Sequence, residues 1–186
     1  MSFDEKWLLT NAKRGNTSAF EEIIKLYQKE VYNSAYFITK SREDALDVSQ
    51  DVFLRLWRSL PSFREDASLR TYIARITRNC ALDYLRGRAK NEADSLYYED
   101  GNTVEIPDTE ASPSIEYEKE ETRLEVRRAI MDLPSPYKEA IIMRELSGLS
   151  YDEIAKATLV SVGTVKSRIS RGREELKKLL RSRNIL

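Results

Sequence analysis

Histidine is absent from this 186-residue chain, and cysteine occurs only once, as Cys80. The first absence removes the commonest general base and the usual transition-metal ligand. The second excludes an internal disulfide and a zinc site built from cysteines. Only six glycines occur, and none falls in a G-x-G-x-x-G or Walker pattern. We therefore expect a protein that is not an enzyme, with no cofactor and no metal, in which Cys80 is a small core residue.

Long apolar runs are also missing, since none approaches the ~20 residues that a membrane-spanning helix needs. The first residues do not form a signal-peptide pattern. We therefore expect a cytoplasmic protein without membrane insertion. Hydrophobic residues make up 41% of the chain and charged residues 33%, which suits a helix-rich protein with apolar cores.

The net charge is zero, but its distribution is uneven. Residues 1–90 carry 16 basic and 12 acidic groups, a balance of +4, and residues 122–186 carry 14 and 8, a balance of +6. Residues 91–121 carry one basic and 11 acidic groups, a balance of −10. Two cationic modules separated by an acidic segment indicate nucleic-acid contact through the two ends.

Apolar residues recur at i, i+3 and i+4, and no strand-like alternation is evident. The fold class predicted is all-α, with two small helical domains (1–90 and 122–186) joined by a flexible acidic linker (91–121). Pro61 is expected to end the third helix and Gly87 to cap the fourth. The helices predicted are residues 4–13, 17–38 (with a break allowed), 42–60, 68–88, 115–133 and 136–146, followed by two short ones.

These last two helices have the spacing of a helix-turn-helix. Ser150 and Glu153 form a capping box for the first of them. The gap 157–160 is short enough for the turn, and Ser161 can cap the second helix. The inward side chains predicted are Ile154 and Ala155 in the first helix, and Val162, Val165, Ile169, Leu176 and Leu179 in the second.

The second helix offers a small, polar and cationic outer face. At 100° per residue, Thr164, Ser167 and Arg171 lie opposite the apolar stripe, and Arg168 and Ser170 flank them. Such a face fits the major groove of DNA. The alternative is an ordinary solvated helix with a basic surface.

The third predicted helix has one apolar side and one polar side with an outward leucine. Leu54 is surrounded there by Asp47, Gln50, Asp51 and Arg58. Protein contacts combine an apolar centre with a polar rim, so this face is a candidate docking site. A single exposed leucine is also common without any function. The apolar side comprises Ala45, Val48, Val52, Phe53, Leu56 and Trp57.

The fourth predicted helix combines cations with aromatic rings. Phe63 lies in the polar loop before it, and Tyr72 follows within its first turns. Cations can follow phosphates while rings stack on bases, so the segment is a candidate single-strand site. A solvated basic face with two core aromatics is the alternative. The stripe of residues expected to face the strand is Thr71, Arg75, Arg78 and Arg86, with Asn79 and Arg70 at its margins.

Four segments in this order resemble the bacterial extracytoplasmic-function (ECF) sigma factors, the smallest type of sigma subunit of RNA polymerase. They are Ala19-Phe20 with Tyr27, the stretch 43–57 (EDALDVSQDVFLRLW), the stretch 63–85 from Phe-Arg to Asp-Tyr-Leu, and the stretch 148–168 from Gly-Leu-Ser-Tyr to Val-Lys-Ser-Arg. Together they cover nearly the whole chain apart from the acidic segment.

The resemblance implies transcription initiation at promoters. It implies that Asp47, Gln50, Asp51 and Leu54 bind the clamp coiled coil of the polymerase β′ subunit. It implies that the loop and helix from Phe63 onward melt the −10 element and capture a flipped base. The residues it assigns to that task are Phe63, Arg64, Tyr72, Arg75, Arg78, Asn79 and Arg86, with Phe63 and Asn79 at the pocket positions.

The resemblance also implies that the last helix reads the −35 element. Lys166, Ser167, Ser170 and Arg171 stand at the family's contact positions. Lys166 is nearer the apolar stripe on a helical wheel, so we assign it to phosphate. The further partners implied are the polymerase β flap, promoter DNA and an anti-sigma factor, with the acidic segment in or near the RNA exit path.

Two residues depart from the family pattern, which commonly has tryptophan at Tyr72 and glycine at Glu65. A glutamate near DNA leaves the −10 preference open. The alternatives to a sigma factor are a free-standing helix-turn-helix regulator, which would bind duplex DNA alone, and a nucleic-acid-processing enzyme.

Overall fold

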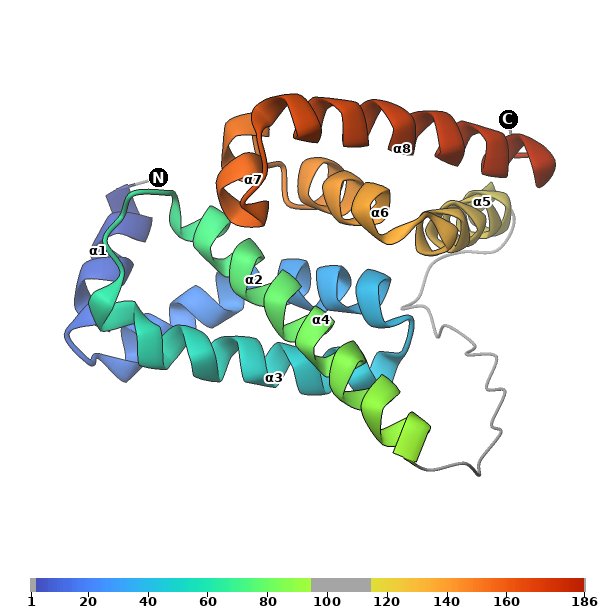
Figure 1. Cartoon of the computed structure of the whole chain (residues 1–186). Coiled ribbons are helices and arrows are strands. Elements are labelled where there is room, and N and C mark those ends of the chain that lie inside the picture. Colours follow the sequence, from blue (N-terminus) through green and yellow to red (C-terminus); the bar gives the residue numbers. More distant parts are fainter. Residues whose placement is uncertain (1–2, 95–114, 186) are drawn as a thin grey trace.

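The computed structural model describes residues 3–94 and 115–185. Within these ranges all regular structure is helical, as the fold class predicted (Figure 1). The first half contains α1 (Phe3–Lys13), α2 (Thr17–Thr39), α3 (Arg42–Ser59), the 3-10 turn η1 (Leu60–Ser62) and α4 (Leu69–Asp94). The second half contains α5 (Ile115–Asp132), α6 (Ser135–Ile141), the π turn η2 (Ile142–Leu146), α7 (Tyr151–Thr158) and α8 (Val162–Ser182).

Side-chain caps fix where several helices begin. Asn16 accepts from the amide of Ala19 at the start of α2, and Ser41 accepts from the amide of Asp44 at the start of α3. Each cap satisfies an amide that has no partner within its helix. The helix α2 is continuous over 23 residues, so the break allowed in the sequence prediction is absent.

The prediction for the end of α4 was wrong. Gly87 was expected to cap this helix, but α4 continues to Asp94. A glycine that caps a helix has a positive φ, and Gly87 is not among the positive-φ residues. An interior glycine weakens a helix by about 1 kcal/mol relative to alanine, and this penalty does not end the helix.

The acidic segment predicted as a linker is described only at its two ends. Residues 91–94 continue α4 and residues 115–121 belong to α5, so both ends are helical rather than extended. The centre of the segment, together with its expected position near an RNA path, lies outside the described residues.

The first half forms one core from all four of its α-helices. Figure 1 shows α2, α3 and α4 against one another, with α1 at one end of the group. Leu9 of α1, Ile23 of α2, Leu56 of α3 and Ile73 of α4 are almost completely buried. The apolar side predicted for α3 points into this core, with Phe53 and Trp57 at its margin.

The second half has its own core between α6, α7 and α8. Ile141, Leu149, Ile154 and Ile169 are its most deeply buried large side chains. Gly172 lets α8 approach α6 closely, since a Cβ there would lie 3.0 Å from Cγ1 of Ile141 and 3.3 Å from Cβ of Tyr137. Leu176 and Leu179 line this core on the inner face of α8, as the sequence predicted.

The two halves lie directly against each other (Figure 1). Ile130 and Ile142 of the second half belong to the first core, and Ala74 of the first half belongs to the second core. Beside these apolar contacts, Arg78 Nε lies 2.5 Å from Glu139 Oε2. The contact therefore combines apolar packing with an ion pair.

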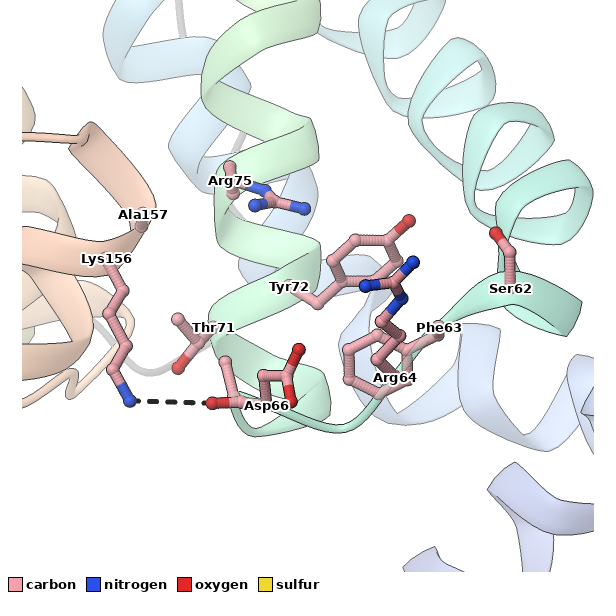
Figure 2. Close-up of a pocket in the computed structure, with 10 residues that line it drawn as sticks. Ser62, Phe63, Arg64, Asp66, Thr71, Tyr72, Arg75, Lys156 and Ala157 are labelled. Carbon is pink, nitrogen blue, oxygen red and sulfur yellow. Dashed lines mark hydrogen bonds between the residues drawn. The ribbon is translucent and has the colours of Figure 1, made fainter.

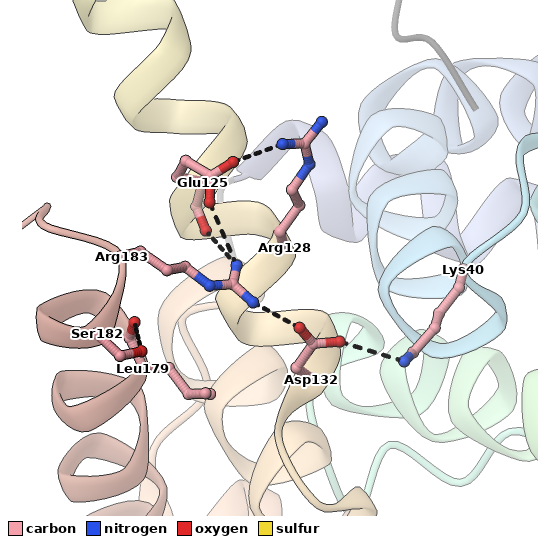
Figure 3. Close-up of polar contacts among 7 residues, drawn as sticks. All are labelled: Lys40, Glu125, Arg128, Asp132, Leu179, Ser182 and Arg183. Carbon is pink, nitrogen blue, oxygen red and sulfur yellow. Dashed lines mark hydrogen bonds and ion pairs between the residues drawn. The ribbon is translucent and has the colours of Figure 1, made fainter. Parts of the chain in front are cut away.

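A second ion-pair network connects α5 to the C-terminal ends of α2 and α8. Figure 3 shows Arg183 between Glu125 and Asp132, and Lys40 on the other side of Asp132. Arg183 Nη2 lies 2.6 Å from Asp132 Oδ2, and Lys40 Nζ lies 3.6 Å from Asp132 Oδ1. Asp132 thus joins the C-terminal end of α8 to the end of α2.

Candidate nucleic-acid interface

An open hollow of about 240 Å³ lies where the loop before α4 meets the first turns of that helix. The rings of Phe63 and Tyr72 stack beside it, with centroids 4.6 Å apart and planes 24° apart. The guanidinium of Arg75 lies 5.1 Å from the centroid of the Tyr72 ring, and Arg64 lines the same hollow (Figure 2). Rings with cations beside them can hold an unstacked base and its phosphates.

Local interactions determine the shape of this loop. Pro61 is the second residue of the 3-10 turn η1, which the amide of Phe63 closes by donating to Leu60 O at 3.1 Å. At the other end, Ser68 Oγ accepts from the amide of Thr71 at 3.2 Å and so caps α4. Glu65 has a φ of 61°, in the left-handed region that favours glycine. The backbone at Glu65 therefore has a conformation that suits the glycine of the family pattern.

One wall of the hollow comes from the second half of the chain. Lys156 and Ala157 of α7 line it, and Lys156 Nζ donates to Asp66 O at 3.5 Å (Figure 2). The sequence analysis missed Lys156, Ala157 and Asp66 as site residues. No local signal identifies them, because they come together only through the contact between the two halves.

Three predicted strand-contacting residues do not line the hollow: Arg78, Asn79 and Arg86. Arg78 is half-buried, and its side chain binds Glu139 of α6 and donates to Asn79 Oδ1 at 3.2 Å. Asn79 and Arg86 are exposed farther along α4. The structure thus brings together Phe63, Arg64, Tyr72 and Arg75 of the predicted set, with Phe63 only 8% exposed and part of the first core.

Thr71 was expected on the strand-facing stripe and is instead buried. Its hydroxyl donates to Glu153 Oε1 at 2.9 Å, as does the hydroxyl of Ser68. Thr71 still lines the hollow, at the point where α7 packs against α4. The other oxygen of Glu153 accepts from the amide of Ser150 at 2.9 Å, which completes the predicted capping box. These hydrogen bonds, led by the Ser150 amide, lower the pKa of Glu153 to about 2.

The helix-turn-helix occupies α7 and α8, as predicted. Leu159 ends α7 in the left-handed conformation, and Ser161 caps α8 by accepting from the amide of Thr164 at 3.1 Å. Val165 and Ile169 are buried on the inner face of α8, and Ala155 of α7 is only half-buried.

The outer face of α8 differs from the helical wheel at three positions. Thr164 is half-buried, and its hydroxyl is hydrogen-bonded to Ser161 Oγ at 2.9 Å. Arg168 is half-buried too, whereas Lys166, expected nearer the buried edge, is exposed. The exposed set available to DNA is Lys166, Ser167, Ser170 and Arg171.

The candidate docking face on α3 is exposed along its length. Asp47, Gln50 and Asp51 point to solvent, and 53% of Leu54 is exposed. The sequence analysis missed a second outward leucine, Leu46, which is 55% exposed. Its position four residues before Gln50 was the available signal, because this spacing returns to within about 40° of the same direction on the helix.

Cys80 is buried in the first core, as predicted, and burial raises the pKa of its thiol to about 11. Across residues 3–94 and 115–185, no group of three or more metal-ligating acidic or cysteine side chains is present. Over the same ranges, no helix is both long and apolar enough to cross a membrane.

The fold and the helix-turn-helix define a two-part helical protein of the transcription machinery. The Sigma-70 region 2 family matches residues 23–91, and the Sigma-70, region 4 family matches residues 123–176. The RNA polymerase sigma-H factor of Pseudomonas aeruginosa is 33% identical over 181 residues, which cover 95% of this chain and 93% of that protein. The ECF RNA polymerase sigma-E factor of Escherichia coli K12 is 34% identical over 173 residues, covering 91% and 90%.

A solved structure agrees with this relationship. The sigma factor RpoE of Bartonella quintana, in complex with the anti-sigma factor NepR, has a TM-score of 0.72 and 26% identity, covering 87% of this chain and 96% of that one. CnrH, solved with the cytosolic domain of CnrY, has the same fold, with a TM-score of 0.70 and 23% identity, covering 96% and 98%. The chain belongs to the ECF family of RNA polymerase sigma factors, as the resemblance predicted.

Proposed function

We propose that this protein joins core RNA polymerase and directs it to promoters by reading a −35 duplex and a single-stranded −10 element. It is not itself an enzyme in this proposal, and it acts in the cytoplasm. The single observation that carries the −10 assignment is the hollow beside α4, where the Phe63 and Tyr72 rings lie with Arg64 and Arg75.

In this proposal, binding energy stabilises the melted promoter. Extruding a base from the stack costs a few kcal/mol, and stacking on an aromatic ring returns ~1–3 kcal/mol per base. Arg64 and Arg75 supply charge for the neighbouring phosphates. We assign Arg78, Asn79 and Arg86 to the strand farther along α4, and the base itself to the Phe63–Tyr72 side of the hollow. This replaces the expectation that Asn79 lines the pocket.

We propose two further contacts. Lys166, Ser167, Ser170 and Arg171 read the −35 duplex, because they are exposed on one helix that a helix-turn-helix presents to the groove. Thr164 and Arg168 support that face from its edges. The polymerase clamp coiled coil binds α3 at Asp47, Gln50, Asp51 and Leu54, to which we add Leu46.

The proposed division of the chain is a region 2 domain (1–90), an acidic linker (91–121) and a region 4 domain (122–186), which also meets the polymerase β flap. An anti-sigma factor is a further proposed partner. The RpoE of Bartonella quintana, which resembles this chain over most of its length, was solved with such a protein.

The test is run-off transcription with sigma-free core polymerase on a promoter library. Adding the wild-type protein is expected to give initiation at defined start points. Asp51→Arg is expected to lose core binding while remaining folded, and Phe63→Ala to bind core but open promoters poorly. Permanganate footprinting separates opening from closed binding. Failure of the wild-type protein to give any start point, or tight specific duplex binding by the protein alone, would contradict the proposal.

A further inference from the structure

Lys13, at the C-terminal end of α1, contacts the loop that forms the base hollow. Its Nζ donates to Phe63 O at 2.8 Å and to Glu65 Oε1 at 3.0 Å. The same nitrogen lies 5.8 Å from the centroid of the Phe63 ring, within the range of a cation–π contact. One ammonium group therefore contacts the backbone, a carboxylate and the ring of one short loop.

Packing of α1 in the first core holds the backbone that carries Lys13 in place. Leu9 and Ala12 are buried in the first core, so the end of α1 that carries Lys13 is fixed against α2. Figure 1 shows the loop between α3 and α4 passing alongside α1. Lys13 lies outside residues 23–91, which match the region 2 family, so that match assigns it no role.

The loop contains a residue in a conformation that needs support. Glu65 has a φ of 61°, which is uncommon for residues other than glycine. Its carboxylate binds Lys13, and Lys13 Nζ also donates to the carbonyl oxygen of Phe63, two residues earlier. The contacts to the Phe63 carbonyl and the Glu65 carboxylate flank Arg64 and restrain the loop on both sides of it.

We propose that Lys13 is a positioning residue of the base hollow, fastening the loop to α1 so that Phe63 and Arg64 keep the geometry that discriminates bases. This proposal rests on the proposed function, since it presupposes that the hollow receives a base. The side chains of Lys13 and Glu65 keep 25% and 46% of their surface exposed, and an ion pair open to solvent in this way adds little to global stability. Removing it therefore acts on the loop rather than on the fold.

The experiment compares Lys13→Met, Lys13→Arg and a control, Arg14→Met, each as a holoenzyme with core polymerase. Arg14 is the adjacent cation; it is exposed, and it makes no hydrogen bond to the loop among the described residues. The templates carry each of the four bases at each non-template position of the −10 element. The readouts are the rate of promoter opening for each base, the affinity for core polymerase and the melting temperature.

Lys13→Met is expected to slow opening roughly tenfold on the preferred template, because small misplacements of a binding group cost this much or more. Preference among the four bases at the captured position is expected to shrink, with core affinity and melting temperature unchanged. Lys13→Arg is expected to restore both rate and preference, and Arg14→Met to behave as wild type. An equal slowing for all four bases, or a Lys13→Met protein that matches Arg14→Met, would overturn the positioning role.

Phe63→Ala separates a failure of the proposed base site from a failure of the role of Lys13. If Phe63→Ala leaves base preference unchanged, the hollow does not receive the base, and the proposed function of the hollow fails. If Phe63→Ala abolishes base preference while Lys13→Met keeps it, the hollow is the base site and only the role of Lys13 fails.

Discussion

Glu153 uses its two carboxylate oxygens for different tasks. One completes the capping box of α7 by accepting from the amide and hydroxyl of Ser150. The other accepts hydrogen bonds from Ser68 and Thr71 at the start of α4. A single side chain thus begins the helix-turn-helix and attaches it to the loop that borders the base hollow. All of these bonds favour the ionised carboxylate, which is why its pKa falls from 4.5 to about 2.

A lowered pKa in the folded protein makes the contribution of Glu153 to stability depend on pH. The stabilisation is fully present above the unfolded value of 4.5 and is lost as the pH falls toward the folded value of about 2. Glu153→Gln keeps the shape of the side chain but not its charge. We expect the melting temperature of wild type to exceed that of Glu153→Gln at pH 6, with the difference closing between pH 5 and pH 2 (roughly the interval between the two pKa values). A difference that is constant over this range would contradict the assignment.

Arg171 is exposed on the outer face of α8, and we propose that it contacts a base. We expect Arg171→Ala to cost about 1–3 kcal/mol at one position of the −35 duplex and little elsewhere. Binding of holoenzyme to single-base variants of the duplex measures this. Lys178→Ala is the matched control, because Lys178 is exposed two turns farther along α8 and binds Glu175. Uniform weakening on every duplex would show instead that Arg171 contacts only phosphate.

At the scale of the helices, α4 is longer than its sequence pattern indicated, and Gly87 lies inside it. A Cβ at Gly87 would meet nothing within 4 Å. We therefore expect Gly87→Ala to raise the free energy of unfolding by about 0.5–1 kcal/mol, by removing the helix penalty of glycine. Urea denaturation measures the change. Gly148→Ala is the control and is expected to destabilise, since Gly148 has a φ of 64°. Destabilisation by Gly87→Ala would mean that this residue caps the helix after all.

The sequence predicted the helix-turn-helix closely because its boundaries are set locally. Ser150 with Glu153, and Ser161 with the amide of Thr164, are contacts between residues three apart, so they can be read from the chain. The end of α4 could not be predicted in this way. Gly87 has the composition signal of a helix stop, but its role depends on its φ, which the sequence does not specify.

At the scale of the whole molecule, two side chains that the sequence places on a DNA-facing stripe meet the other half of the chain. Thr71 and Arg78 were expected on a DNA-facing stripe, and both contact the second half of the chain, through Glu153 and Glu139 respectively. A polar pattern shows that a helix face needs water, DNA or another polar face. It does not show which of these covers it. The wall that Lys156 adds to the hollow could not be predicted for the same reason.

The close contact between the halves sets a requirement for promoter recognition. Elements at −10 and −35 lie about 25 base pairs apart, or ~85 Å at ~3.4 Å per base pair. A compact chain of this length has a radius of gyration of only about 16 Å. The two halves must therefore separate to read both elements at once. Residues 95–114 have a covalent reach of at most ~70 Å, and the two domains add their own dimensions to this span.

We therefore expect the halves to move apart when the protein joins polymerase at a promoter. Dyes on Lys25→Cys and Leu159→Cys measure this by energy transfer, because both positions are exposed and belong to different halves. Cys80 does not interfere, since it is buried and its raised pKa keeps the thiol unreactive. Transfer is expected to be strong in the free protein and to fall sharply in the promoter complex. A dye pair on Leu159→Cys and Lys178→Cys, both in the second half, should show no change. Strong transfer from the first pair in a functional open complex would mean that the contact between α4 and α7 persists, and would contradict the expected separation of the halves.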